Sequence, residues 1–340
     1  MIALVTGGGG FLGGAIVRRL LARGAKVRSF TRTAYPWLAE LGVEQVKGDL
    51  SKLDDVRSAV SGCDIAYHVA AKAGVWGWYD DYYSTNVLGT KNVLQACREA
   101  GVPKLVYTST PSVVHDGGDI EGGNESLPYP KRFSSVYPET KAIAEQAVLR
   151  ANGPELSTVA LRPHLIWGPG DPHLIPRLLA RAQAGKLRRV GAKNVVVDTT
   201  FVDNAALAHV RAADALAPDS PVAGKAYFIS NGEPMPMWDF LNRILADRGI
   251  EPVTRHVPLW LAKFAGSAYE AVYRLFRIAA EPPMTRFVAE QLGTSHWYDI
   301  AAARRDFGYS PEVSIEDGLR RLSSRTSESA PAAPARARMR

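Results

Sequence analysis

The sequence has only two cysteines, Cys63 and Cys97. They lie far apart in segments of ordinary core character, so we expect neither a disulfide framework nor a metal site built on cysteine spacing. A reducing, cytoplasmic location fits this scarcity. The chain opens directly on an apolar run, Ile2 to Val5, which leaves no room for the charged start and apolar core of a secretory signal, so secretion is not expected.

Concentrated positive charge is also scarce. The net charge is +7, but four arginines and one glutamate among residues 325–340 contribute +3 of it. The rest of the chain is only mildly basic, which suits an anionic cofactor or substrate. No dense stripe of Lys and Arg with interleaved aromatic residues occurs, so we expect no binding to nucleic acid.

A long uninterrupted apolar run is missing as well. The most apolar stretch, residues 258–280, is interrupted by Lys263, Glu270, Arg274 and Arg277. Because a spanning helix needs about 20 predominantly apolar residues, we expect no membrane span here. Three alternatives stay open for this stretch: a core helix of a smaller lobe, a lid over the substrate, and an interfacial helix in peripheral contact with a membrane.

The first half of the chain alternates short apolar runs with segments whose apolar residues recur at helical spacing. This alternation is typical of βαβ units that stack a parallel sheet. We therefore expect an α/β protein with a doubly wound parallel sheet, the Rossmann arrangement, over residues 1–165. The runs expected to form its strands are Ile2 to Val5, Lys26 to Phe30, Val43 to Lys47, Ile65 to Val69, Leu105 to Thr108 and Thr158 to Leu161.

Beyond residue 165 the pattern loosens into loops rich in Gly and Pro and scattered helices. Residues 166–322 are expected to form a smaller, mixed substrate lobe that closes over the carboxyl edge of the sheet. Two runs within 195–230, Val195 to Phe201 and Ala226 to Ile229, are expected to return to the first lobe as further strands. Residues 323–340 are rich in Ser, Ala, Pro and Arg, and we expect a disordered tail there.

A glycine-rich turn follows the first expected strand and precedes an expected helix. It reads TGGGGFLG over residues 6–13, with glycines at the spacing G-x-x-G-x-x-G. Such glycines permit a tight turn and let backbone N–H groups approach a dinucleotide pyrophosphate at the positive end of the helix dipole. A merely flexible turn is the alternative. The residues expected to bind the pyrophosphate are Gly7, Gly9, Gly10, Phe11, Leu12 and Gly13.

The tip of the second strand indicates which dinucleotide is bound. Enzymes that use NAD usually place an acidic residue there to bond the ribose 2′-hydroxyl. This chain has Arg32 and no carboxylate, which favours the 2′-phosphate of NADPH or NADP, unless Arg32 is simply solvated. Asp49 and Leu50 could bracket the adenine. Ala70 and Ala71 could underlie the adenosine, although either pair could also be strand-end packing.

Tyr137 and Lys141 are four residues apart and therefore share one face of a helix. Pro138 predicts that Tyr137 lies in the first turn of that helix, where a missing N–H costs little. A phenol of pKa near 10 is a poor base at neutral pH, and lowering that pKa by ~3 units requires ~4 kcal/mol of preferential phenolate stabilisation. We expect Lys141 and an oxidised nicotinamide, both cationic, to supply it. Tyr137 is thus the predicted proton donor or acceptor, tuned by Lys141.

A third group is needed to hold the substrate oxygen. Thr110 lies just past the fifth expected strand, at the carboxyl edge of the sheet, where ligands bind. Ser109 and Ser112 offer equivalent hydroxyls, and all three could instead cap the turn. Asn86 could complete a proton relay or could tie a helix to a neighbouring loop.

With these residues the chain resembles the extended short-chain dehydrogenase/reductase family over residues 1–322. Within that family it resembles the 3β-hydroxysteroid dehydrogenase branch, through YTST at 107–110, LRPHLIWGPGD at 161–171 and YFISNGE at 227–233. It is more similar still to bacterial reductases of 2-alkyl-3-oxoalkanoic acids in long-chain olefin biosynthesis, through AGVWG at 73–77, EPPMTRF at 281–287 and ARRDFGY at 303–309. Thr110 stands where many relatives carry Ser, which preserves the hydroxyl and adds a methyl group.

The resemblance implies an activity. NADPH would deliver hydride to the 3-oxo group of a 2-alkyl-3-oxoalkanoic acid while Tyr137 protonates the nascent alkoxide, giving the 3-hydroxy acid. Lys141 would also hold the nicotinamide ribose, and Pro163 would contact the cofactor. Trp76 and Trp167 are candidate walls of the pocket for the lipid-like keto acid, or core residues. Arg286 is a candidate partner for its carboxylate, or a member of a surface ion pair.

Other functions share the same fold. A 3β-hydroxysteroid dehydrogenase, oxidising a sterol and decarboxylating it or not, would use the same hydroxyls with a flat pocket. A nucleotide-sugar epimerase and a non-catalytic NADP sensor are further alternatives, although a sensor predicts loss of Tyr137 or Lys141. The resemblance also implies a homodimer through helices near residues 82–100 and 137–152, and partner enzymes of the same pathway could dock on the surface.

Overall fold

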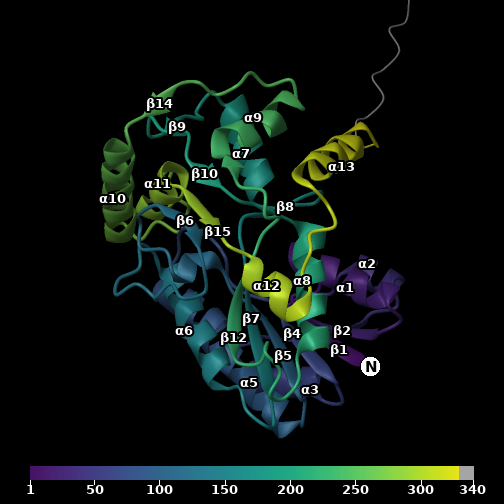
Figure 1. Cartoon of the computed structure of the whole chain (residues 1–340). Helices are drawn as coiled ribbons and strands as arrows, with labels where there is room; N and C mark the ends of the chain where they lie inside the picture. Colours follow the sequence, from purple (N-terminus) through teal and green to yellow (C-terminus); the bar gives the residue numbers. More distant parts are fainter. Residues whose placement is uncertain (329–340) are drawn as a thin grey trace, which may run out of the picture.

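The computed structural model describes residues 1–328, and its centre is a seven-stranded parallel sheet (Figure 1). The strand order is β12-β7-β5-β4-β1-β2-β3, and every neighbouring pair is parallel. The predicted doubly wound α/β fold is confirmed. The strands are β1 (Ile2–Thr6), β2 (Lys26–Thr31), β3 (Glu44–Lys47), β4 (Ile65–His68), β5 (Lys104–Thr108), β7 (Ser157–Pro163) and β12 (Lys225–Ile229).

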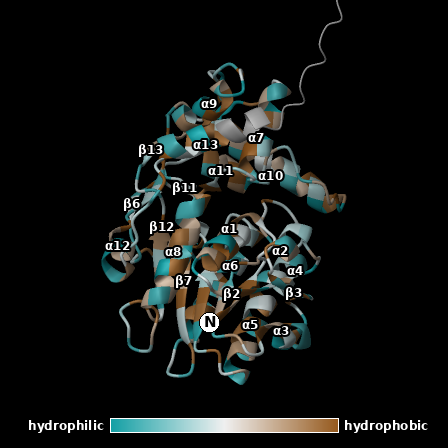
Figure 2. Cartoon of the chain, turned by 90° about the vertical axis from the view of Figure 1, so that its right-hand side faces the viewer, coloured by the Kyte–Doolittle hydropathy of each residue, from teal (hydrophilic) through white to brown (hydrophobic). Residues whose placement is uncertain are grey.

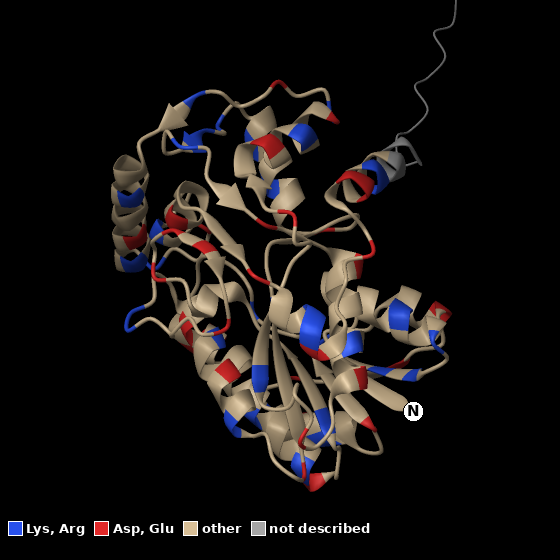
Figure 3. Cartoon of the chain, in the orientation of Figure 1, with Lys and Arg blue, Asp and Glu red and all other residues tan. Residues whose placement is uncertain are grey.

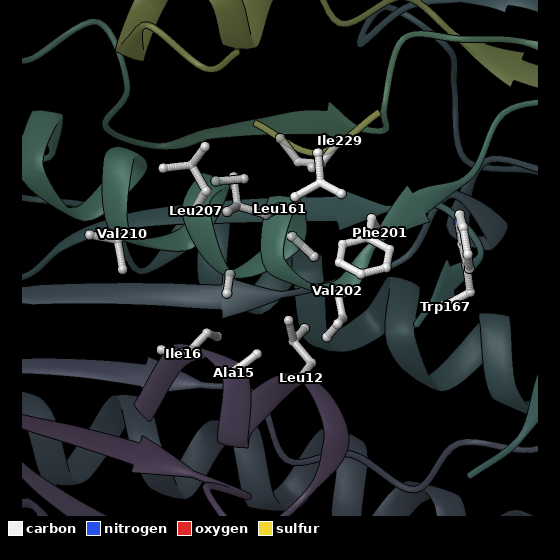
Figure 4. Packing of buried hydrophobic residues seen from close by; sticks show 14 of the residues in the cluster. Leu12, Ala15, Ile16, Leu161, Trp167, Phe201, Val202, Leu207, Val210 and Ile229 are labelled. Atoms are coloured by element: carbon white, nitrogen blue, oxygen red, sulfur yellow. The ribbon is translucent and has the colours of Figure 1, made fainter. Parts of the chain in front are cut away.

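Helices cover both faces of this sheet, because successive residues of a buried strand point to opposite sides. Ala3 and Val5 of β1 belong to the core cluster on one face, whereas Leu4 belongs to the cluster on the other. The first face is covered by α1 (Phe11–Ala22) and α8 (Val202–Ala215), whose apolar side chains meet in Figure 4. The other face is covered by α3 (Leu53–Val60), α5 (Gly89–Glu99) and α6 (Val136–Arg150).

Several short elements connect or flank this lobe. Cys63 and Cys97 are both buried and free within the part of the chain that the structure describes. A π-helical turn, η1, precedes α5, and a 3₁₀ turn, η2, follows β5. The connecting elements are α2 (Pro36–Glu40), α4 (Tyr79–Tyr82), η1 (Tyr83–Leu88), η2 (Pro111–Val113) and α12 (Ala301–Phe307).

A smaller, mixed lobe lies beyond the carboxyl ends of the parallel strands (Figure 1). It holds a four-stranded sheet of order β13-β10-β15-β6 and two two-stranded sheets, β11-β8 and β14-β9. Its strands are β6 (Ile120–Gly123), β8 (Ile166–Trp167), β9 (Arg189–Val190), β10 (Val196–Val197), β11 (Thr200–Phe201), β13 (Met235–Pro236), β14 (His256–Val257) and β15 (His296–Tyr298). Its helices include α7 (Leu174–Gln183), α9 (Met237–Ala246), α10 (Leu259–Leu275) and α11 (Arg286–Gly293).

The structure corrects two expectations about the second half of the chain. Residues 195–201 do not join the large sheet, because they split into β10 and β11 and pair within the smaller lobe. Residues 225–229 do join it, as β12 beside β7. Helix α13 (Ile315–Glu328) extends six residues into the segment expected to be a tail from 323 onward. Residues 329–340 lie outside the described part.

Helix α10, at the right-hand edge of the small lobe in Figure 2, leaves most of its large apolar side chains exposed. Trp260, Phe264 and Leu275 are 70%, 68% and 76% exposed. The buried positions are small: Ala262 and Gly266, where an added Cβ would lie 2.6 Å from the backbone N of Arg286. The alternative of a core helix is therefore wrong, and peripheral membrane contact stays a prediction. Within residues 1–328, no helix has the length and apolar character needed to traverse a bilayer.

Candidate active site

The glycine turn between β1 and α1 is a tight backbone cradle. Gly7, with φ of 72°, donates its N–H to the carbonyl oxygen of Phe30 at 2.9 Å, and Gly10 donates to the oxygen of Gly7 at 2.9 Å. A Cβ on Gly13 would lie 2.1 Å from the Gly7 oxygen. The first turn of α1 therefore packs directly on the loop, and only glycine fits at position 13.

The start of α1 offers unpaired backbone donors. Gly10 is the N-cap and has no side chain to bond the first amides of the helix. The N–H groups of Phe11 and Leu12 therefore have no acceptor inside the helix. They sit at the positive end of a twelve-residue helix, where an anion such as a pyrophosphate is favoured. The residues present fit a dinucleotide at this turn.

The expected adenosine residues lie around the same end of the sheet. Asp49 follows β3, and its carboxylate accepts hydrogen bonds from the N–H and hydroxyl of Ser51, each at 2.9 Å. These bonds, and to a smaller extent the charge of Arg32, lower the pKa of Asp49. Arg32 directly follows β2 and is exposed near this carboxylate, and among the described residues no acidic side chain lies within 4 Å of its guanidinium. Leu50 is buried next to Asp49.

The floor of the cradle is formed by the end of β4. The Thr6 hydroxyl oxygen accepts hydrogen bonds from the N–H groups of Val69 and Ala70, both at 3.1 Å, which fixes this segment against the loop. A Cβ added to Gly7 would lie 3.1 Å from Ala70, so the two segments are nearly in contact. Ala71 follows and is partly exposed. Farther along the same edge, Pro163 ends β7 and is buried.

Tyr137 lies in the first turn of α6 and lines a cleft at the carboxyl edge of the sheet. Burial raises the pKa of Tyr137 to about 12, and a hydrogen bond with Thr110 opposes this shift. At neutral pH the phenol is therefore protonated, which is the form that gives a proton to a developing alkoxide.

Lys141 lies one turn further along α6 and is buried. Its ammonium donates to the carbonyl oxygen of Thr108 at 2.6 Å and lies 4.2 Å from the centre of the Tyr107 ring. Burial lowers the pKa of Lys141 to about 7, against the attraction of Glu145. The expected lowering of the Tyr137 pKa by Lys141 is thus not present in this structure, because burial of the phenol dominates and the ammonium bonds to Thr108.

Among the three candidate hydroxyls, Thr110 is the one whose side chain interacts with Tyr137. The Thr110 hydroxyl also donates to the Ser112 hydroxyl at 3.2 Å and accepts from the Ser112 N–H at 3.3 Å, so it caps the η2 turn as well. The Ser109 hydroxyl is buried with no hydrogen-bond partner in the described chain. The two proposed roles of Thr110, capping and facing the phenol, are compatible.

Asn86 joins three segments from the π-helical turn η1. Its side-chain oxygen accepts from the Lys72 N–H at 2.8 Å, and its amide donates to the Lys72 oxygen and the Thr140 hydroxyl, both at 3.1 Å. All of these contacts are within the protein, so the alternative in which Asn86 ties a helix to the loop after β4 matches the geometry. The π-helical turn is what aims this amide at α6.

Trp76 lines the same cleft as Tyr137. Its indole N–H donates to the carbonyl oxygen of Ile278 at 3.1 Å, and its ring contacts the Tyr273 ring edge-on at 6.0 Å. The loop after β4 is therefore fastened to the end of α10. The residues lining the cleft are Gly74, Val75, Trp76, Gly77, Tyr82, Ser134, Ser135, Val136, Tyr137, Glu270 and Arg274.

Two expected substrate contacts lie elsewhere. Trp167 is fully buried; its indole N–H donates to the Thr199 hydroxyl at 3.0 Å, and Phe201 and Phe240 pack on its ring. It is a core residue, because β8 pairs with β11 and turns the indole inward. Arg286 pairs with Glu290, one turn later in α11, at 3.1 Å, and it does not line the cleft.

Sequence reasoning missed the cleft residues on α10. Glu270 and Arg274 line the same cleft as Tyr137, and Figure 3 shows charged bands on this otherwise uncharged helix. The signal was available: an acid and a base four residues apart interrupt the most apolar stretch of the chain.

Sequence reasoning also missed a buried series of hydrogen-bonded polar side chains between the two lobes. His164, just after Pro163, contacts Asp198 at 2.5 Å and His296 at 3.0 Å. Asp198 in turn accepts from the backbone N–H of Tyr298 at 3.0 Å. These residues are far apart in sequence and carry no local pattern that pairs them. Their hydrogen bonds attach the smaller lobe to the end of β7, beside the predicted cofactor site.

Comparison with known proteins identifies the family to which this chain belongs. A model of the 3-beta hydroxysteroid dehydrogenase/isomerase family matches residues 4–259. The chain is 55% identical to the 2-alkyl-3-oxoalkanoate reductase of Stenotrophomonas maltophilia (strain K279a), over 95% of this chain and 98% of that protein. It is 39% identical to the sterol-4-alpha-carboxylate 3-dehydrogenase, decarboxylating, of Homo sapiens, over 93% and 86%. The crystal structure of gox2253 has a TM-score of 0.77 at 26% identity, covering 96% of this chain and 98% of the other.

The expected family is confirmed by these comparisons. The matched region includes the glycine turn, Thr110, Tyr137 and Lys141, and the bacterial and human relatives each align over more than nine-tenths of the chain. The chain therefore belongs to the 3-beta hydroxysteroid dehydrogenase/isomerase family and is an oxidoreductase that acts on hydroxyl or keto groups.

Proposed function

We propose that this protein uses NADPH to reduce the 3-oxo group of a 2-alkyl-3-oxoalkanoic acid to the 3-hydroxy acid, as a step of long-chain olefin biosynthesis. The chemistry is supported by the placement of Tyr137, whose phenol lines the cleft from the first turn of α6 and interacts with the side chain of Thr110. The substrate class is supported by the 55% identity, over nearly the whole chain, to two proteins named 2-alkyl-3-oxoalkanoate reductase.

In this proposal Tyr137 donates the proton that turns the carbonyl oxygen into a hydroxyl. A phenol with a raised pKa stays protonated until the oxygen beside it gains negative charge. Thr110 orients the same oxygen through its hydroxyl. Lys141 lies one helical turn from Tyr137 with an ammonium of lowered pKa, so it can relay a proton or bond a ribose hydroxyl near neutral pH.

The glycine turn and Arg32 would hold the dinucleotide. The backbone donors of Phe11 and Leu12 suit its pyrophosphate. The exposed guanidinium of Arg32 suits a 2′-phosphate, which is the reason to propose NADPH. The bound nicotinamide supplies the hydride. The protein residues position it, exclude water and move the proton.

A sterol is the second candidate substrate. The human relative at 39% identity is named a sterol-4-alpha-carboxylate 3-dehydrogenase, and it could use the same phenol, lysine and hydroxyl. The likeness to sugar-nucleotide enzymes, such as the complex of MoeE5 with UDP-glucose and NAD, is at 24% identity and concerns the fold alone.

A substrate panel tests the proposal. Purified full-length protein is assayed for oxidation of NADPH and of NADH, separately, with a 2-alkyl-3-oxoalkanoic acid, a 3-ketosteroid and a UDP-sugar. We expect the β-keto acid with NADPH to give the highest kcat/KM. A higher kcat/KM for the steroid would support the second candidate, and a preference for NADH would contradict the role of Arg32.

A further inference from the structure

The cleft beside Tyr137 has one cationic side chain in its lining, and it comes from α10. Of the eleven lining residues, Arg274 is the single Lys or Arg and Glu270 the single acid. Arg274 is exposed, so it stands where the cleft meets solvent. Arg274 and the proton donor Tyr137 therefore line the same cleft.

Arg274 rests on an aromatic platform. Its guanidinium carbon lies 5.8 Å from the centre of the Trp76 ring. That ring is fixed by the hydrogen bond to Ile278 and by edge contact with Tyr273. A guanidinium over an indole face gains cation–π attraction and keeps its N–H edge free for hydrogen bonds.

The acids near Arg274 are engaged with other groups. Glu270, one turn earlier on α10, accepts the backbone N–H of Arg286 at 2.8 Å, at the start of α11. Glu290 contacts Arg286 and Lys263. Among residues 1–323, no carboxylate lies within ion-pair distance of Arg274. Its fork of N–H donors is therefore available to an acid from outside the chain.

The proposed substrate carries such an acid close to its reacting atom. In a 2-alkyl-3-oxoalkanoate, one carbon separates the carboxylate from the carbonyl carbon that accepts hydride. A carbonyl oxygen bonded to Tyr137 therefore leaves the carboxylate within the same small cleft. Arginine is the side chain best suited to a carboxylate, because two parallel N–H groups match its two oxygens.

Resting on the proposed function, we propose that Arg274 binds the carboxylate of the β-keto acid, the role that the sequence suggested for Arg286. Binding of the carboxylate by Arg274 determines which face of the substrate and which of its oxygen atoms reach Tyr137. It also selects acids over neutral ketones of the same shape. Arg286 cannot serve, because Glu290 already neutralises it outside the cleft.

The test compares an acid with its own ester. The probes are a 2-alkyl-3-hydroxyalkanoic acid and its methyl ester, oxidised with NADP, because the hydroxy acid does not lose carbon dioxide as a β-keto acid does. Wild type, Arg274→Gln, Arg274→Lys and the matched control Arg277→Gln are measured; Arg277 is an exposed arginine that does not line the cleft. Thermal unfolding checks that each variant is folded.

We expect Arg274→Gln to raise KM for the acid about 10- to 100-fold, the loss of a charge-assisted hydrogen-bonded pair, with kcat little changed. For Arg274→Gln, KM for the ester should stay within twofold of the wild-type value. The KM of Arg274→Lys for the acid should lie between those of wild type and Arg274→Gln, and Arg277→Gln should match wild type. An unchanged KM for the acid, or an equal loss for acid and ester, overturns the inference. A wild type that oxidises neither probe but oxidises a 3β-hydroxysteroid overturns the proposed function itself, and the role of Arg274 with it.

Discussion

Helices α1 and α10 are both rich in apolar residues, yet they bury opposite kinds of side chain. In α1, Leu12, Ile16 and Leu20 are buried against the sheet and α8. In α10, the buried residues are Ala262 and Gly266, and the large side chains face outward. Because α10 approaches α11 closely at Gly266, no larger residue fits there. The face of α10 that carries small residues is therefore the face that packs.

Apolar content therefore predicts a helix but not which face of that helix is buried. For α1, the spacing of large apolar residues coincides with the packed face, because the sheet beside it offers a broad apolar surface. For α10, the neighbour is another helix at close range, and the charged residues Glu270 and Arg274 line the cleft. The nucleotide lobe therefore presents a buried apolar helix beside the site, whereas the substrate side carries a helix with exposed apolar side chains.

The largest expected effect is at the cradle in front of α1. Gly13→Ala would place a Cβ about 2.1 Å from the Gly7 oxygen, so the loop must move and its amides lose their alignment. We expect NADPH affinity, measured by fluorescence titration, to fall at least about 100-fold, with stability lower by about 1–3 kcal/mol. Gly153→Ala, at a position with open space around it, is the control. Normal NADPH affinity in Gly13→Ala would contradict the cradle.

One substitution in each helix compares α1 and α10 directly. Ile16→Ala removes a fully buried side chain of α1 and should lower the free energy of unfolding by about 2–5 kcal/mol. Phe264→Ala removes a larger side chain of α10 that is mostly exposed, and should change the free energy of unfolding by no more than about 0.5 kcal/mol. Urea unfolding of both variants gives these values. Similar losses from the two substitutions would mean that α10 is covered in solution.

The smallest effect concerns the buried charge of Lys141. Its pKa is about 7 in the folded protein and about 10.4 unfolded, so between these values the unfolded chain binds more protons. Stability therefore rises with pH across this window, by about 1 kcal/mol per pH unit, and is constant below it. Lys141→Met should lose this rise, measured by urea unfolding at pH 7 and pH 9, whereas Lys91→Met, at an exposed lysine of α5, should keep it. Equal slopes in wild type and Lys141→Met would contradict the lowered pKa.

The nucleotide lobe was predictable because its signals are local. Each expected strand from Ile2 to Leu161 forms, since a buried parallel strand needs a short apolar run. The glycine turn and the spacing of Tyr137 and Lys141 depend on neighbours within a few residues. The family was predictable from motifs in the same regions.

The smaller lobe was less predictable because its contacts are long-range. Trp167 is buried by residues 32 to 73 positions away, and no local pattern distinguishes it from Trp76, which lines the cleft. The hydrogen bonds from His164 to Asp198 and His296 likewise span the lobe. Arg274 and Arg286 look alike in sequence, and only the packing of α10 on α11 separates their roles.

In the proposed mechanism, the Tyr137 phenol transfers the proton while the cradle binds the dinucleotide independently. Tyr137→Phe, with Tyr79→Phe on the exposed surface of α4 as the matched control, tests it through NADPH affinity and ketone reduction measured together. We predict unchanged NADPH affinity with reduction lowered about 10²- to 10⁴-fold in Tyr137→Phe, and wild-type values in Tyr79→Phe. Reduction by Tyr137→Phe at near wild-type rate would contradict the role of Tyr137 as the proton donor.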